Sequence, residues 1–138
     1  MSSLANTFSL DAVRRLSNAA KLNVTGLVLI AAGMSLQMAA GSTLYPSLAG
    51  PIVLLVTAVI VLFGPGRWTP YIGLLVPLVL GVGATIAALM TGDFLDQLTD
   101  VDRAGILIGS LLHVIGLVAA VAGGVGMVLA RRVVRVER

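Results

Sequence analysis

Four long runs of apolar residues, flanked by short segments that hold all the charged residues, dominate the chain. They cover about residues 22–40, 44–63, 71–90 and 104–130, and none of them contains Asp, Glu, Lys or Arg. A helix needs about 20 apolar residues to cross roughly 30 Å of hydrocarbon, so each run is long enough to span a bilayer. The pattern predicts an all-α fold, with an integral membrane bundle of four transmembrane helices within residues 22–130.

The second of these runs is the least regular. Its uninterrupted apolar part covers only residues 52–63, and a full-length span has to include Pro46, Gly50 and Pro51. Proline is tolerated near the first turn of a helix, because the N–H that it lacks has no partner there. We therefore keep residues 44–63 as a predicted span.

The composition excludes a water-soluble domain. Hydrophobic residues make up 58% of the 138 positions and charged residues only 11%, with a mean hydropathy of +1.06. Soluble domains are about one quarter charged, and a chain this short cannot hide so much apolar surface from water. Neither a disordered tail nor a nucleic-acid partner fits these numbers. The sequence has no cysteine, which excludes disulfides and thiolate chemistry.

Lysine and arginine are concentrated in three of the segments outside the apolar runs. Residues 1–21 contain three of them, residues 64–70 one and residues 131–138 four. The segments 41–51 and 91–103, in contrast, contain none and one. Positive residues favour the cytoplasmic side of a membrane, so both termini are predicted to be cytoplasmic. This requires an even number of crossings.

The basic residues also predict where the chain contacts the membrane surface. Residues 9–21 are expected to form a short amphipathic helix on the inner surface, and residues 131–138 a basic cytoplasmic tail. The residues expected to meet anionic headgroups of the inner leaflet are Arg14, Arg15, Lys21, Arg131 and Arg132. Arginine outnumbers lysine in a chain rich in Ala, Val and Gly, which is typical of GC-rich bacteria. We therefore expect the plasma (inner) membrane of a bacterium.

Small residues form one face of the predicted helix at residues 104–130. At 100° per residue, seven positions fall within an arc about 100° wide. They are Gly109, His113, Gly116, Ala120, Gly123, Gly124 and Met127. Lipid gives helices no hydrophobic reason to associate, so close backbone approach across small residues must provide the contact. The glycines and the alanine of this group are therefore predicted to form a helix-packing face.

The first and third runs have similar faces. In the first run the shared face consists of Gly26, Ile30, Gly33, Gln37 and Ala40. The third run has a broader small-residue side, made of Gly73, Pro77, Gly81, Ala84 and Ala88. Pro77 removes the hydrogen bond to the carbonyl of Gly73, and we expect it to kink this helix.

A few polar side chains fall inside the predicted spans. His113 and Gln37 are the only large ones expected well inside, and Ser110 and Thr85 lie in the same outer halves. Polar groups within a bilayer are functional candidates, so one hypothesis is an intramembrane pocket that binds a ligand or moves a proton. The other hypothesis is that a neutral His113 hydrogen-bonds Gln37, Ser110 or a backbone carbonyl and holds the bundle together.

The polar residues do not form a recognisable catalytic set. The aspartates at residues 91–103 have no companion histidine and lack the spacing of a calcium loop. No Gly-rich loop carries the lysine of a phosphate site. We therefore expect no enzyme, no metal and no cofactor. A haem- or quinone-associated anchor is disfavoured, because a haem held in a helical bundle commonly needs two axial ligands and the chain has one histidine.

Two functional hypotheses follow from the sequence. The first is an accessory or scaffolding subunit that packs laterally against other membrane proteins or against copies of itself. The second is a small oligomeric transporter or flippase for a lipidic or uncharged substrate, with His113 and Gln37 in its pocket and Pro77 as its hinge.

Overall fold

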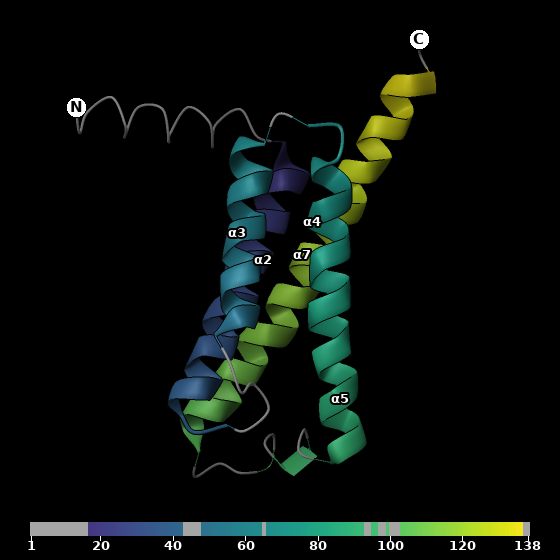
Figure 1. The fold of residues 1–138 in the computed structure, drawn as a ribbon. Helices are drawn as coiled ribbons and strands as arrows, with labels where there is room; N and C mark the ends of the chain where they lie inside the picture. Colours follow the sequence, from purple (N-terminus) through teal and green to yellow (C-terminus); the bar gives the residue numbers. More distant parts are fainter. Residues whose placement is uncertain are drawn as a thin grey trace, which may run out of the picture.

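The computed structural model describes residues 17–42, 48–64, 66–92, 95–96, 99 and 103–136. This part of the chain is helical and contains no strand, as predicted (Figure 1). The elements are α2 (Asn18–Ala39), α3 (Ala49–Phe63), α4 (Thr69–Pro77), the π-helical turn η1 (Leu78–Val82), α5 (Gly83–Thr91) and α7 (Ala104–Val136). Within these residues, three helical segments are long and apolar enough to cross a membrane, namely Asn18–Ala39, Thr69–Thr91 and Ala104–Val133.

The first helix, α2, begins four residues before the predicted span because Ser17 caps it. The Ser17 hydroxyl accepts a hydrogen bond from the backbone N–H of Ala20, at 3.2 Å, which satisfies one of the open donors in the first turn. Lys21 therefore lies on α2 itself and is exposed, instead of ending a separate surface helix. The rest of the predicted surface helix, with Arg14 and Arg15, lies outside the described residues.

The second helix, α3, is shorter than the span predicted from the sequence. It has 15 residues, which corresponds to about 22 Å at 1.5 Å per residue. Pro51 sits in its first turn and is buried, where the N–H that proline lacks would have no helical partner. The predicted beginning of the span, at residue 44, lies outside the described residues.

The third helical segment runs from α4 through η1 to α5 and contains Pro77. Proline cannot donate to the carbonyl of residue i−4, here Gly73. The chain accommodates this break with the π-helical turn that follows Pro77 immediately, a local widening that is typical of interrupted helices. The segment ends at Gly92, whose φ of 78° is the left-handed conformation that favours glycine.

The last helix, α7, continues six residues beyond the predicted end of its span, to Val136. Its 33 residues correspond to about 50 Å, so its C-terminal end projects past the other helices (Figure 1). Arg131, Arg132 and Arg135, which belong to the predicted basic tail at residues 131–138, consequently lie on this helix.

The helices form a bundle in which α2, α3, α4 and α7 each contact at least two of the others. α2 makes by far its largest contact with α7, α3 lies against α2 and α4, and α4 lies against α7. α2 and α7 run antiparallel, because Gly123 lies beside Ala19 whereas Gly109 lies beside Gly33.

Three close pairs of small residues join α2 to α7, and we call this contact the glycine seam. The pairs are Ala19–Gly123, Gly26–Gly116 and Gly33–Gly109. A Cβ added to Gly116 would lie 2.7 Å from the carbonyl oxygen of Gly26, and one added to Gly33 would lie 2.5 Å from that of Gly109. The pairs recur every seven residues on both helices, which is the repeat of a left-handed coiled coil.

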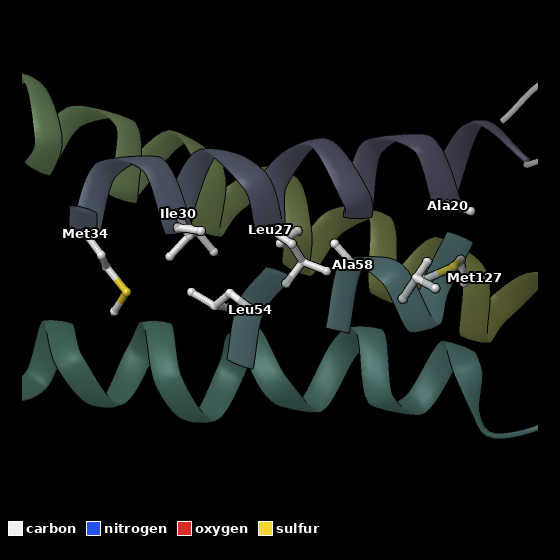
Figure 2. Close-up of a cluster of buried hydrophobic side chains, with 10 residues drawn as sticks. Ala20, Leu27, Ile30, Met34, Leu54, Ala58 and Met127 are labelled. Atoms are coloured by element: carbon white, nitrogen blue, oxygen red, sulfur yellow. The ribbon is translucent and has the colours of Figure 1, made fainter. Parts of the chain in front are cut away.

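On the other side of α2, larger side chains fill the space toward α3. Figure 2 shows Leu27 and Ile30 on the side of α2 that faces Leu54 of α3. All three side chains are fully buried. This cluster shows ordinary interdigitation of apolar side chains, in contrast to the backbone contact on the α7 side.

The glycine seam predicts a position-specific cost for added methyl groups. Gly26→Ala and Gly116→Ala each place a Cβ against a facing backbone carbonyl, so we expect each to lower the free energy of unfolding by about 1–3 kcal/mol. The measurement is unfolding by SDS titration in mixed micelles, followed by circular dichroism.

The matched control is Gly83→Ala, because a Cβ at Gly83 would meet no atom within 4 Å. Alanine has the higher helix propensity, so this variant should be unchanged or more stable by up to about 1 kcal/mol. Equal losses at Gly26, Gly116 and Gly83 would show that the seam is not as close as described.

Candidate functional site

A buried asparagine joins three helices at one level of the bundle. Asn23 of α2 is 0% exposed. Its Nδ2 donates to the carbonyl oxygen of Gly73 in α4, at 2.7 Å, and to that of Ala120 in α7, at 2.6 Å. Both neighbours can only accept, so the nitrogen of the amide must be the atom that faces them. Asn23 is therefore a polar tie between α2, α4 and α7.

The bond to Gly73 follows from the position of Pro77. Because Pro77 has no N–H, the carbonyl of Gly73 lacks its usual helical donor. An unpaired carbonyl in an apolar interior is costly, and the Asn23 amide supplies the missing donor. Gly73 itself leaves room for the amide, since a Cβ there would lie 2.8 Å from Asn23 Oδ1.

Asn23 is not among the polar residues predicted from the sequence to lie inside the bundle, although two features of the sequence indicated it. The predicted span began at residue 22, which placed Asn23 at its edge instead of inside it. Asn23 nevertheless precedes Gly26 by three positions, on the same face of the helix. The free carbonyl expected at Gly73 also required a donor from a neighbouring helix.

Two of the predicted polar residues meet at Gly81, within the π-helical turn. Thr85 donates its hydroxyl to the carbonyl of Gly81, at 2.8 Å, and the His113 side chain lies against the backbone of Gly81. His113 is 4% exposed. Gly81 also allows α7 to approach, because a Cβ there would overlap the side chain of Leu117.

The other two predicted polar residues lie nearer the C-terminal end of α2. Ser110 donates to Ile106 of its own helix, at 2.9 Å. Gln37 is 2% exposed, and its Cγ lies 2.6 Å from the position that a Cβ on Gly109 would occupy. Its Oε1 accepts no hydrogen bond from the described residues. The structure thus connects His113 with Thr85 through Gly81 and places Gln37 against Gly109.

The small residues predicted as one packing face of α7 contact two different helices. Gly109, Gly116, Gly123 and Ala120 lie against α2. Gly124 instead faces α4, where a Cβ would lie 2.9 Å from the Cα of Leu74. The division has a simple geometric cause, because consecutive residues of a helix are 100° apart and Gly124 is turned away from α2.

Of the predicted surface arginines, Arg131 makes a contact that the sequence did not indicate. Its guanidinium donates to the carbonyl oxygens of Gly66 and Arg67, which connect α3 to α4. Arg132 lines a surface pocket beside it. The contact places the connection between α3 and α4 and the C-terminal part of α7 at the same end of the bundle.

In the part of the chain that the structure describes, no three residues among His, Cys, Asp and Glu come together as metal ligands would. No protein-family model, curated protein or solved structure matches this chain.

The Asn23 tie predicts that two substitutions interact. Asn23→Ala removes both interhelical bonds and leaves the Gly73 carbonyl without a donor, so we expect the free energy of unfolding to fall by about 1–2 kcal/mol. Pro77→Ala restores an N–H at position 77 that can bond to Gly73. Asn23→Ala should therefore cost measurably less when Pro77→Ala is also present.

The measurement is a double-mutant cycle from SDS titrations of the four proteins. Thr57→Ala serves as the control, because the buried Thr57 hydroxyl donates within its own helix, to Val53 at 2.8 Å, and should show no coupling to Pro77. A strictly additive cycle for Asn23 and Pro77 would refute the role assigned to the Gly73 carbonyl.

Proposed function

We propose that this protein is a small multi-pass membrane protein that acts as an accessory or scaffolding subunit, packing laterally against other membrane proteins or against itself. Three membrane-length apolar helices support the membrane location. The observation that carries the role is the use of the buried polar side chains. Asn23 donates to backbone carbonyls of α4 and α7 and so ties three helices together. Thr57, Thr85 and Ser110 each donate to a carbonyl four residues earlier in the chain, so these hydroxyls are also used within the bundle.

A surface for lateral packing is available on α5. Gly83, Ala87 and Thr91 are exposed and four residues apart, so they lie along one side of this helix. A Cβ at Gly83 would meet nothing within 4 Å. The glycine seam, in contrast, is already occupied within the chain. Small exposed residues at this spacing permit the close helix approach that drives association in lipid.

For the orientation, we propose four crossings of a bacterial inner membrane with both termini in the cytoplasm. Lys21, Arg67 and the arginines of the α7 C-terminal end gather at one end of the bundle, which supports a common cytoplasmic side for them. α3 would be the fourth crossing. Its apolar side chains Val53, Val56 and Ile60 are exposed, as expected for a surface in contact with lipid.

Transport of a lipidic or uncharged substrate is the second candidate function. Two observations favour it. The Oε1 of buried Gln37 accepts no hydrogen bond within the part of the chain that the structure describes, and a π-helical turn follows Pro77 at Leu78–Val82. Interrupted helices and intramembrane polar groups are common at transport sites. In this proposal the segment around Pro77 is the hinge, and His113 with Gln37 lines the pathway.

The accessory role predicts that a bulky residue on α5 disrupts association. The wild-type chain, extracted gently from its own membrane, should be found in a complex heavier than one 14.1 kDa chain. The partner in that complex can be a second copy of the chain or another protein. Ala87→Leu should release the chain from that complex, because the larger side chain blocks close helix approach. Native mass spectrometry of the extracts measures the masses.

The control is Ala32→Leu, the same change at an exposed position of α2, which should leave the complex intact. His113→Ala with Gln37→Ala separates the two candidate functions. The accessory role predicts that this double variant still assembles and functions, whereas transport predicts that it assembles without function. A wild-type chain extracted only as a monomer would contradict the accessory role.

A further inference from the structure

An arginine-rich surface pocket lies where the connection between α3 and α4 meets the C-terminal part of α7. Its volume is about 240 Å³. Its lining residues are Arg67, Trp68, Tyr71, Arg131, Arg132 and Arg135. From this lining we infer that the pocket binds the phosphate of an anionic phospholipid headgroup.

Positive charge dominates the lining of the pocket. Four guanidinium groups line the pocket, and no described residue contributes a carboxylate to it. Arg131 holds the two walls together by donating to the carbonyls of Gly66 and Arg67. Those acceptors are neutral, so the positive charge of Arg131 is retained. The planar fork of N–H donors on arginine matches the oxygens of a phosphate.

The aromatic rim of the pocket favours a lipid over a free anion. Trp68 and Tyr71 are 66% and 40% exposed, and their ring centroids are 6.2 Å apart. Tryptophan and tyrosine at the end of a membrane helix typically lie at the level of the lipid headgroups. Beyond this rim, α4 exposes Leu75, so acyl chains can continue along the apolar surface of the helix below a bound headgroup.

The inference rests on the membrane location and orientation proposed above, and does not depend on the accessory role. Basic pockets between membrane helices on the cytoplasmic side are suited to lipid headgroups that carry phosphate. Basic residues spread over a surface attract any anionic lipid. The arginines of this pocket are instead fixed on one helix and one loop, so they can select a headgroup that fits between them. Lys21, which is exposed on α2, is not among its lining residues.

Trp68 is the single tryptophan of the chain and reports directly on the pocket. The full chain in dodecyl maltoside micelles is titrated with dihexanoyl-phosphatidylglycerol while Trp68 fluorescence is recorded. We expect a saturable change that dihexanoyl-phosphatidylcholine and inorganic phosphate do not produce at the same concentrations. The absence of a saturable change, or an equal response to inorganic phosphate, would overturn the lipid site.

Single-charge variants test the geometry. Arg132→Gln and Arg135→Gln should each raise the phosphatidylglycerol concentration needed for half-saturation about fivefold, as expected for the loss of one cation near an anionic lipid headgroup. Lys21→Gln removes an equal charge outside the pocket and should change the response less than twofold. Equal losses at all three positions would show unspecific attraction and overturn the proposal. A chain that assembles with partners but shows no saturable response to phosphatidylglycerol would refute the lipid site and leave the accessory role standing.

Discussion

Direct contact between the backbones of α2 and α7 is the interaction on which the rest of the structure depends. In lipid, apolar side chains gain little by moving from acyl chains to another helix, so association requires close packing and interhelical hydrogen bonds. The glycine seam provides the packing. It brings the two backbones so close, at Gly26–Gly116 and at Gly33–Gly109, that a Cβ on these glycines would collide with a facing carbonyl oxygen, and this close packing increases the dispersion attraction between the helices.

This close approach also explains why the hydrogen bonds of Asn23 are short and directed at the backbone. At the distance set by the seam, the carbonyl of Ala120 lies within reach of the Asn23 amide. The amide then has a second N–H available, and the gap in α4 created by Pro77 offers the carbonyl of Gly73. A proline that would weaken an isolated helix thereby becomes an attachment point for its neighbour, as is common in membrane bundles.

The sequence predicted the parts of this fold that depend on composition and periodicity. The four apolar runs gave the helices in number and approximate place, and the 3.6-residue period put Gly26, Gly33, Gly109 and Gly116 on the faces that now meet. Effects that depend on a partner helix were harder to see. Gly124 falls in the same arc as Gly123, and only the position of α4 separates them.

Other features could not be read from one segment at a time. A helix can accommodate a proline such as Pro77 either with a kink or with a π-helical turn. The structure has the π-helical turn, and Leu117 and His113 pack against Gly81 within it. Arg131 donates to two carbonyls that precede it in the sequence by 64 and 65 positions. The periodicity of a single helix cannot predict a contact over that separation. The early start of α2 depended on a single cap, Ser17.

The whole bundle requires α2 and α7 to lie antiparallel in the register of the glycine seam. The chain has no cysteine, so pairs can be introduced without background. A Cβ on Gly126 would lie 3.0 Å from that of Ala19, and one on Gly105 would lie 3.0 Å from that of Ala40. Both distances are shorter than the ~3.8 Å of a disulfide, so each pair can be bridged after a small outward shift of the backbones. Oxidation in the native membrane should therefore crosslink Ala19→Cys with Gly126→Cys, and Ala40→Cys with Gly105→Cys, within one chain. Crosslinking of the exchanged pairs, Ala19→Cys with Gly105→Cys or Ala40→Cys with Gly126→Cys, would contradict the account.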